Sequence, residues 1–457
     1  MRKKCGGIAT VSASGTLNSN NQKTEIEKDT FRKLYAAISL MSFSNGVYAP
    51  FIGIYAAEIG FGYSEMGTLR AVGNVTPTLL QPVWGGLSDR YANRKLFIII
   101  GLIFASLLLP TFLYVQTPIE LILLYGLQSV FLSMTIPTWN ALLGGLIPEE
   151  KRGTLLSKIN TFGSIWSLVA TILSGALMTL IVTSSVREVY VIPFYLSAIS
   201  GILASVVVVF IREPTMKNKK VKSSGFMLKK IGMNRHFKKL LFASIVYSGG
   251  MSMIWPYFPI ILVNIIHASK IEISLQNALQ FLMLILLQPY FGRIIDRVGR
   301  KPIIVLSRFL LVPVPFILLF ATSMIPIYII ALIAGVSFAM LNNAILAYIF
   351  DVSPPEEQAS YVAIYNVVTG ILFFFGSLIG GFLGDYFSLF VDPYFAMELV
   401  IFLCGILRFI GSFFYLSLEE PKVYKKTLRA EFMQVIRNIK RSIIHFRDVT
   451  KPNFRLK

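Results

Sequence analysis

Long apolar runs separated by short polar intervals make up most of this chain of 457 residues. A helix that crosses a bilayer needs about 20 mostly apolar residues. Barrel strands would instead alternate polar and apolar positions, and the longest runs here do not. The pattern predicts about twelve transmembrane helices, at residues 34–57, 65–86, 96–116, 119–145, 156–184, 190–211, 238–265, 274–294, 302–322, 325–350, 361–386 and 394–417.

The longest polar interval between two spans lies at residues 212–236 and is strongly basic. It divides the spans into an N-terminal half at 33–211 and a C-terminal half at 237–417. Residues 1–32 are rich in Ser, Asn, Thr and Lys and have no apolar core of a signal peptide, so we expect a disordered cytoplasmic tail. The basic tail at 418–457 is either an amphipathic helix on an anionic membrane face or a solvated segment.

Composition agrees with a lipid environment. Hydrophobic residues make up 55% of the chain and charged residues 14%, against about 25% charged in soluble domains. The net charge is +20, and nearly all basic residues fall in loops on one side, while the opposite loops carry only Arg187 and Lys270. This asymmetry places both termini in the cytoplasm of a multi-pass plasma-membrane protein. It explains the charge without nucleic acid as a partner.

Several function classes lack their signatures in this sequence. The two cysteines, Cys5 and Cys404, lie in a polar tail and an apolar run, and no Cys/His cluster has metal-ligand spacing. No phosphate-binding Walker sequence is present. The spans contain no clustered nucleophile or His/Asp/Glu constellation. We therefore expect no metal, no cofactor and no enzyme.

Two segments share the pattern Gln-Pro-x-x-Gly-x-x-x-Asp-Arg. One begins at Gln81 and the other at Gln288, each at the cytoplasmic end of the second span of its half. Their aspartates, Asp89 and Asp296, are 296 − 89 = 207 residues apart. The Pro-Glu-Glu sequences that start at residues 148 and 355 have the same offset. One register held over such distances indicates duplicated halves, a known architecture of transporters.

The motif and the arrangement of spans resemble the major facilitator superfamily. The resemblance implies an all-α membrane fold of about 12 helices in two pseudo-symmetric six-helix bundles. It also implies secondary active or facilitative transport of a small organic solute by alternating access. The implied gating motif comprises Gly85, Asp89, Arg90, Arg94, Lys95, Gly292, Asp296, Arg297, Gly299, Arg300 and Lys301. The first copy departs from the family pattern, with Ala92 in place of Gly and Asn93 in place of a basic residue.

The resemblance further implies what the two aspartates face. Asp89 would meet the start of the eleventh span near Ser360 and Tyr361, and Asp296 would meet the start of the fifth span near Thr154. A carboxylate at a helix N-terminus is favoured by the helix dipole, so each contact could act as a latch between halves. The alternative is that these residues only cap helices and set topology.

The resemblance places the substrate site between the halves, lined by the first, fourth, seventh and tenth spans. Arg70, deep in the second span, either binds an anion, snorkels outward, or pairs with Glu58 or Glu65. Arg308, near a cytoplasmic end, is expected to snorkel. The substrate-binding candidates are Asn45, Tyr48, Arg70, Asn74, Trp139, Asn140, Tyr247, Trp255, Asn342, Asn343, Tyr365 and Asn366.

The coupling mechanism stays open at this point. The centre of the first span has Asn45 and no acid, and Tyr125 precedes Gln128 where many drug/proton antiporters of the family carry an arginine. These features weaken a proton-coupled drug or metabolite efflux function, although a coupling proton or sodium ion remains possible. A function from another class is a membrane scaffold or sensor with a recruiting basic tail. The family resemblance implies a monomer.

Overall fold

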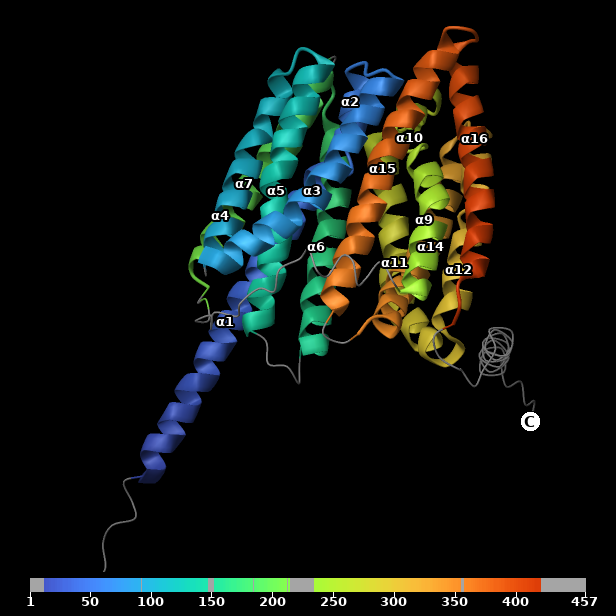
Figure 1. Ribbon diagram of the computed structural model, residues 1–457. Helices are drawn as coiled ribbons and strands as arrows, with labels where there is room; N and C mark the ends of the chain where they lie inside the picture. The colour runs from blue at the N-terminus through green and yellow to red at the C-terminus, as the bar shows by residue number, and fades with distance from the viewer. Residues whose placement is uncertain are drawn as a thin grey trace, which may run out of the picture. The chain divides into compact units, whose positions relative to one another are not determined.

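The computed structural model describes residues 12–91, 93–146, 152–183, 185–211, 213, 234–354 and 357–420, with the backbone alone at 12–28, 89, 152–154, 156, 157 and 359. This part of the chain is helical and contains no β-strand (Figure 1). It divides into two compact units, one of residues 1–220 with 267–275 and one of residues 221–266 with 276–457. The second tail, from residue 421, lies outside the described residues.

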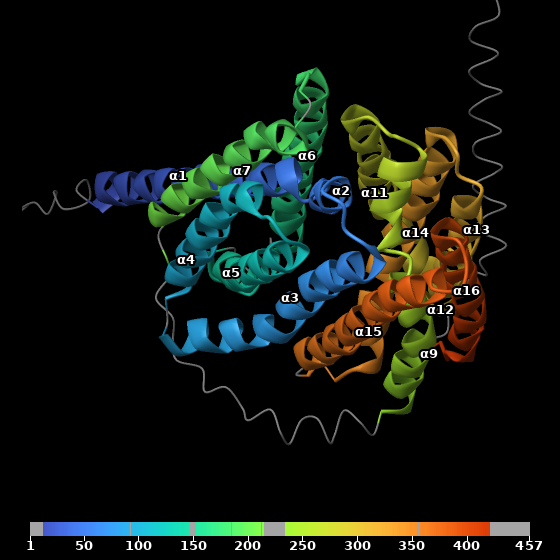
Figure 2. The same ribbon diagram turned by 90° about the horizontal axis from the view of Figure 1, so that it is seen from above.

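Unit 1 contains six long helical segments. They are α1 (Ser12–Tyr48) continued by α2 (Ile52–Glu58), α3 (Tyr63–Tyr91), α4 (Arg94–Leu108) continued by a short 3-10 helix (Pro110–Tyr114), α5 (Pro118–Leu146), α6 (Arg152–Leu180) and α7 (Val186–Val209). Helix α1 packs on α6 and α7, α3 packs on α5, and α4 packs on α5 and α7 (Figure 2).

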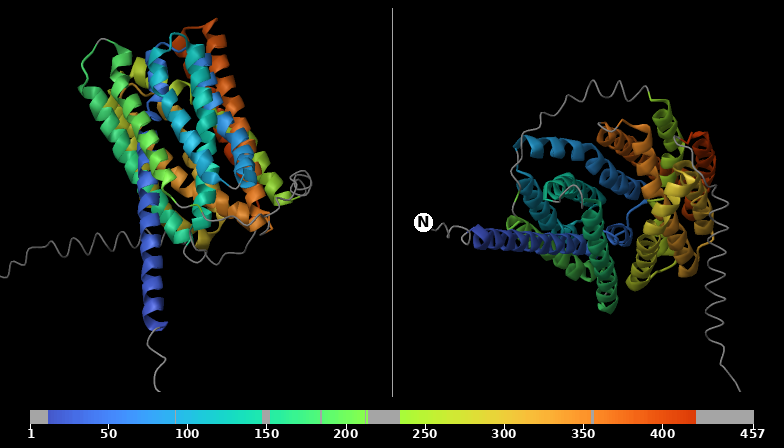
Figure 3. Two further views of the ribbon diagram at one scale, coloured as in Figure 1. Left: turned by 90° about the vertical axis from the view of Figure 1, so that its left-hand side faces the viewer. Right: turned by 90° about the horizontal axis from the view of Figure 1, so that it is seen from below.

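Helix α1 begins much earlier than the apolar pattern suggests. The first span is expected from residue 34, after a disordered tail, whereas the described helix starts at Ser12. Its N-terminal part extends past the helices of unit 1 on which the remainder of α1 packs (Figure 3). A polar stretch without apolar periodicity gives no signal that distinguishes a helical continuation from disorder. Residues 1–11 lie outside the described part.

Unit 2 repeats the arrangement. Its helices are α9 (Arg235–Ser252) with α10 (Tyr257–Ile260) and a π-helical turn (Ile261–Ile265), α11 (Lys270–Val298), α12 (Arg300–Leu310) with α13 (Pro313–Leu319), α14 (Met324–Val352), α15 (Gln358–Ser388), and α16 (Pro393–Phe414) with a 3-10 turn (Tyr415–Ser417). Helix α9 packs on α15 and α16 as α1 packs on α6 and α7, and α12 packs on α14 as α4 packs on α5.

Eleven helical segments among the described residues are long and apolar enough to cross a membrane. The predicted second span lies in α3. This helix has 29 residues and is long enough to cross a membrane, but it is too polar to be counted among the eleven. The predicted break near Ser323 is confirmed, because Ser323 precedes the first residue of α14. The lipid-facing surfaces carry many exposed large apolar side chains, as expected of spans in hydrocarbon.

A proline break in the first span organises the centre of unit 1. Pro50 has no N–H to donate to the carbonyl of Gly46, four residues earlier. The Thr171 hydroxyl of α6 donates to that carbonyl at 2.9 Å, and the Ser174 hydroxyl donates to the carbonyl of Val47 at 2.9 Å. Buried backbone oxygens near the break therefore find donors on a neighbouring helix, as lipid-embedded backbone requires.

A second set of hydroxyl bonds joins α1 to α7. Ser44 donates to the carbonyl of Ser197 at 2.8 Å, and Ser197 donates to the carbonyl of Ser44 at 2.7 Å. The backbones approach closely because small residues line the contact. A Cβ atom on Gly201 of α7 would lie 3.2 Å from Ser44 Oγ of α1 and 2.0 Å from Ser106 Oγ of α4. Small residues and interhelical hydroxyl bonds replace the hydrophobic driving force that is missing between helices in lipid.

Unit 2 has an equivalent break between α9 and α10, before Pro256. Side chains of α16 bind the carbonyls released there. Cys404 Sγ donates to the carbonyl of Gly250 at 2.6 Å, and Arg408 Nη2 donates to the carbonyl of Met251 at 2.9 Å. The deep charge of Arg408 thus serves a structural contact with backbone dipoles.

The first turn of α11 belongs to unit 1. Ser269 and Glu272 cap it reciprocally, with the Ser269 N–H donating to Glu272 Oε2 at 2.8 Å. Lys270 forms a half-buried ion pair with Glu58, and the Tyr190 hydroxyl donates to the other oxygen of Glu58 at 2.8 Å. These contacts fix the start of α11 against α2 and α7.

Gly46→Ala should destabilise the protein by about 1–3 kcal/mol, the usual cost of overpacking. A Cβ atom at Gly46 would lie 2.4 Å from the carbonyl oxygen of Ser167, a backbone atom that cannot turn aside. The matched control is Gly86→Ala, where a Cβ atom would meet nothing within 4 Å. The measurement is the unfolding midpoint of purified protein in detergent. Equal midpoints for the two variants would show that α1 and α6 are not held this closely.

Candidate substrate cavity and gating motifs

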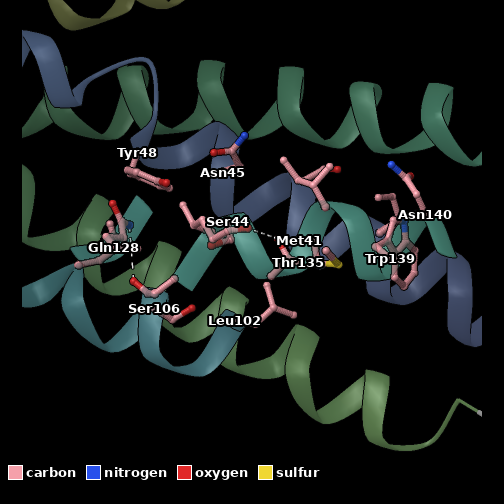
Figure 4. Close-up of a pocket in the computed structure, with 16 residues that line it drawn as sticks. Met41, Ser44, Asn45, Tyr48, Leu102, Ser106, Gln128, Thr135, Trp139 and Asn140 are labelled. Carbon is pink, nitrogen blue, oxygen red and sulfur yellow. Dashed lines mark hydrogen bonds between the residues drawn. The ribbon is translucent and has the colours of Figure 1, made fainter. Parts of the chain in front are cut away.

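A cavity of about 300 Å³ lies inside unit 1. Its walls come from α1, α4 and α5, and its size is at the lower end of the range for ligand pockets. Four of the substrate-binding candidates expected from sequence line it together, namely Asn45, Tyr48, Trp139 and Asn140. Further lining residues include Met41, Ser44, Leu102, Ser106, Gln128 and Thr135 (Figure 4).

The two ends of the cavity differ in chemistry. Tyr48 and Gln128 lie at one end, and Trp139 and Asn140 lie at the other (Figure 4). Gln128 and Trp139 are 11 residues apart on α5, which corresponds to about 16 Å along a helix. Met41 and Leu102 lie between the ends together with Ser44 and Thr135, whose hydroxyls donate to backbone carbonyls (Figure 4). The cavity therefore offers polar groups at both ends of a mostly apolar middle.

Two buried polar atoms of the lining have no hydrogen-bond partner among the described residues. They are Gln128 Oε1, an acceptor, and Trp139 Nε1, a donor. The amide nitrogen of Gln128 donates to the carbonyl of Ala105, at 3.5 Å. Buried polar groups are almost always satisfied, so an acceptor and a donor are left for a bound molecule. Gln128 was not among the expected site residues, although it matches the glutamine that follows the arginine of many drug/proton antiporters of the family by three residues.

The remaining candidates of unit 1 lie on α3. Arg70 is placed against Tyr125 of α5, with which it interacts electrostatically. It pairs with neither Glu58, which binds Lys270, nor Glu65, which accepts a hydrogen bond from the Gly62 N–H at 2.8 Å. Asn74 donates to the carbonyl of Arg70 at 2.8 Å, a hydrogen bond within α3.

The candidates of unit 2 divide between packing and exposed positions. Asn343 donates to the carbonyl of Gln288 at 3.0 Å, joining α14 to α11. Trp255 packs on Phe373 with ring centroids 4.9 Å apart. Three further candidates are placed as follows: Tyr365 is half-buried, and Asn342 and Asn366 are exposed.

The expectation that Arg308 snorkels is wrong. The side chain is buried in unit 2, with its guanidinium 4.4 Å from the ring centre of Tyr247 and 4.8 Å from that of Tyr415. Tyr247, a substrate-binding candidate, is fully buried in this contact. Stacking on aromatic faces stabilises a buried arginine. A position near the end of a span gave no hint of these rings, which come from distant segments.

Basic residues of the first motif copy tie α4 to its neighbours within unit 1. Arg94 Nη1 donates to the carbonyl of Ala141 at 2.6 Å, and Lys95 Nζ donates to the carbonyl of Val209 at 2.6 Å. The backbone N–H groups of Arg94 and Lys95 donate to the carboxylate of Glu213, at 2.7 and 3.4 Å. Arg90 is exposed at the end of α3.

The second copy makes the corresponding contacts in unit 2. The N–H groups of Arg300 and Lys301 donate to the carboxylate of Glu420, at 3.1 and 2.9 Å. Arg300 also binds two aspartates, Asp351 at 3.0 Å and Asp296 at 3.1 Å. Arg297 lies exposed on the last turn of α11.

Glu213 and Glu420 were missed as motif partners, although a signal was present. Each is followed by proline, at the end of the sixth span of its half, and the two are separated by the same offset as Asp89 and Asp296. In both units the carboxylate caps the N-terminus of the third helix, where the helix dipole favours negative charge. Beside Glu420, the Lys239 ammonium lowers the pKa of the Glu419 carboxyl through a hydrogen bond.

The departures in the first motif copy have a local explanation. Gly299 has a φ of 108°, a conformation open mainly to glycine, and precedes α12. Asn93 precedes α4 instead as its N-cap, with a side-chain oxygen that accepts from the Leu96 N–H at 3.1 Å. Ala92 and the side chain of Asp89 lie outside the described residues, so the partner expected for Asp89 stays a prediction.

The glycines of the motifs make only ordinary contacts. A Cβ atom on Gly85 would lie 3.8 Å from Pro137, and one on Gly292 would lie 3.6 Å from Asn343. Neither therefore permits an unusually close approach within its own unit. Among the residues that the structure describes, no group of three or more His, Cys, Asp or Glu side chains could hold a metal ion.

Comparison with known proteins decides the family. The model of the Major Facilitator Superfamily matches residues 34–239 and again residues 240–455. The chain belongs to the Major Facilitator Superfamily. It is therefore a multi-pass membrane transporter, and the expected fold of two pseudo-symmetric helical bundles is confirmed. The two superfamily matches begin 206 residues apart (240 − 34), close to the offset of the motifs.

Two relatives within the superfamily are named for drug resistance. The quinolone resistance protein NorA of Staphylococcus aureus is 26% identical over 361 residues, which cover 77% of this chain and 89% of NorA. The multi-drug resistance efflux pump PmrA of Streptococcus pneumoniae is 22% identical over 376 residues, 79% of this chain and 90% of PmrA. Both alignments span most of the transporter.

Solved structures agree with this fold. The nucleoside transporter NupG superposes with a TM-score of 0.70 at 13% identity, covering 85% of this chain and 98% of NupG. A bacterial homolog to the human lysosomal transporter Spinster, inward-facing and unoccupied, gives a TM-score of 0.66 at 12% identity, with 85% and 96% covered. At such low identity these superfamily members show the fold alone.

The two aspartates that bind Arg300 should differ in their effect on stability. Asp351 is 8% exposed and Arg300 is 12% exposed, so Asp351→Ala removes a largely buried charged hydrogen bond and should cost about 1.5–3 kcal/mol. Asp296 is 73% exposed, and Asp296→Ala should cost about 0–1 kcal/mol. Unfolding midpoints in detergent give the comparison. A loss for Asp296→Ala as large as that for Asp351→Ala would contradict the assignment.

Proposed function

We propose that this chain carries a small, largely apolar organic solute with hydrogen-bonding groups across the plasma membrane, and that the cavity of unit 1 binds it. The observation that carries the proposal is the pair of buried, unpartnered atoms in the cavity wall, Gln128 Oε1 and Trp139 Nε1. The apolar middle of the cavity suits an aliphatic or aromatic body. Asn45 and Asn140, both exposed residues of the cavity wall, supply further polar contacts.

The proposed orientation has both termini in the cytoplasm. The junctions between α3 and α4 and between α11 and α12 carry the clustered basic residues of both motif copies. Positive charge collects on the cytoplasmic side of membrane proteins. In this orientation the Tyr48–Gln128 end of the cavity is the outer end. We further propose that the chain acts as a monomer.

A second candidate is proton-coupled efflux of drugs or metabolites. It is favoured by the two relatives named for quinolone and multi-drug resistance. Against it stands the lack of an acidic residue near Asn45 at the centre of the first span. Uptake of candidate solutes into proteoliposomes, with and without an imposed pH gradient, separates the two. Transport that depends on the gradient supports the antiporter, and transport unaffected by it supports the facilitative carrier.

Trp139→Ala should lower transport at least about tenfold, because it removes a donor and an aromatic wall from the cavity. Trp166→Ala is the matched control, since Trp166 lies on α6, is 39% exposed and does not line the cavity. Initial rates in proteoliposomes with equal protein content are the measurement. Equal rates for the two variants would place the substrate elsewhere.

The scaffold or sensor alternative is tested by removing residues 421–457. Deletion of this basic tail should leave the transport rate unchanged if the protein is a carrier. Loss of partner recruitment with no transport by either form would support the scaffold instead.

The latch role of the two motif aspartates is also part of this proposal. Asp89→Ala and Asp296→Ala should each shift the balance of inward- and outward-facing states and slow transport, because a carboxylate contact that favours one state is lost. Accessibility of introduced cysteines on the two membrane faces reports the populations. Unchanged populations and rates at normal expression in both variants would leave these residues as helix caps only.

A further inference from the structure

Arg70 is a cation in the membrane-spanning part of unit 1 without a carboxylate partner among the described residues. Its Nε is buried and has no hydrogen-bond acceptor. The nearby acids are engaged elsewhere, Glu58 with Lys270 and Tyr190, and Glu65 with the Gly62 N–H. Its electrostatic partner is Tyr125, a neutral phenol at ordinary pH. Arg70 is half-buried, and a charge that is partly removed from water without an opposite charge is destabilised, so the site favours an anion.

Arg70 is connected to the cavity through α5. Tyr125 precedes Gln128 by three residues, and residues at that spacing share one helix face. Gln128 and Tyr48 form the wall at one end of the cavity, and Tyr48 interacts electrostatically with Tyr125. Tyr125 therefore lies on the face of α5 that carries the lining residue Gln128, although neither Tyr125 nor Arg70 itself lines the cavity.

Packing holds Tyr125 in this position. Its ring lies on Gly73 of α3, where a Cβ atom would come within 2.7 Å of the ring. The Val72 side chain of α3 likewise packs against Gly126 of α5, where a Cβ atom would lie 2.9 Å from it. The close approach of α3 and α5 keeps the Tyr125 hydroxyl beside Arg70, with one turn of α3 between Gly73 and the arginine.

We propose that Arg70 and Tyr125 form an anion subsite, and that the solute is an amphipathic organic acid. Its carboxylate binds the Arg70 guanidinium and the Tyr125 hydroxyl, and its apolar body extends between α1, α4 and α5 toward Trp139. This inference rests on the proposed function of the cavity. Arginine suits the role because its planar donors match the two oxygens of a carboxylate.

The test compares an acid with a neutral molecule of the same shape. The probes are 1-naphthoate and 1-naphthamide, and the measurement is calorimetric binding to the purified full-length chain in detergent at about pH 7.5, where the acid is ionised and Arg70 is charged. The wild-type protein binds naphthoate at least about tenfold more tightly than naphthamide, the ratio expected for one charge-assisted contact. Arg70→Gln abolishes this preference while naphthamide binding stays unchanged, and Arg70→Lys retains part of it.

Two further variants separate a binding role from a structural one. Tyr125→Phe removes one hydroxyl and reduces naphthoate affinity several-fold with naphthamide affinity unchanged. Arg187→Gln is the matched charge control, because Arg187 donates to the carbonyl of Val115 at 2.7 Å, away from the cavity, and it leaves the preference intact. Unfolding midpoints confirm that each variant is folded.

The outcomes distinguish this inference from the function on which it rests. Equal affinity of the wild-type protein for both probes, or a preference that survives Arg70→Gln, overturns the anion subsite and leaves the cavity as a site for neutral solutes. Failure of both probes to bind overturns the cavity as the substrate site and the subsite with it. An equal loss of preference in Arg187→Gln would show a general effect of net charge and also overturns the subsite.

Discussion

A proline within a membrane-spanning helix leaves a backbone carbonyl without its donor, and hydrocarbon supplies no substitute. That constraint governs the centre of unit 1. The carbonyl of Gly46 cannot accept from an N–H of residue 50 and accepts instead from the hydroxyl of Thr171. The hydroxyl of Ser174 donates to the carbonyl of Val47. These bonds require α6 to lie close to α1, and Gly46 itself allows the approach. The same stretch of α1 carries Asn45 and Tyr48, so the break that must be satisfied also positions one wall of the cavity.

Three arginines within the spans, Arg70, Arg308 and Arg408, lie in three different surroundings. Arg408 is bound to the carbonyl of Met251 beside the break of the seventh span. Arg308 is enclosed by tyrosine rings. Arg70 interacts with the Tyr125 phenol and has no carboxylate partner in the described part of the chain. The Nε atoms of all three lack an acceptor there, so the difference lies in the neighbours of each guanidinium: a backbone carbonyl for Arg408, two aromatic rings for Arg308 and one phenol for Arg70.

Much of the fold could be predicted from the sequence, because span length and charge bias follow directly from bilayer thickness and topology. The repeated motif identified the two halves and the place in each half where the third helix begins, because both copies occur at the same offset along the chain. The residues that bind those motifs were harder to predict. Glu213 and Glu420 lie far along the chain from Arg94 and Arg300, and only their shared offset relates them. The burial of Arg308 depends on rings from two other helical segments, which no local pattern reveals.

The cavity shares two of its walls, the first and fourth spans, with the site that the resemblance implied. All of its lining residues belong to unit 1, so its shape is set by the packing of α1, α4 and α5 and not by how the two units are arranged. A solute bound there would travel with unit 1 during alternating access, and only the path to the cavity would have to open and close. The first turn of α11, held by Glu58 and Tyr190, moves with unit 1 as well, whereas the chain from Gln276 onward belongs to unit 2. Helix α11, which ends at the second copy of the gating motif, is therefore shared between the two units.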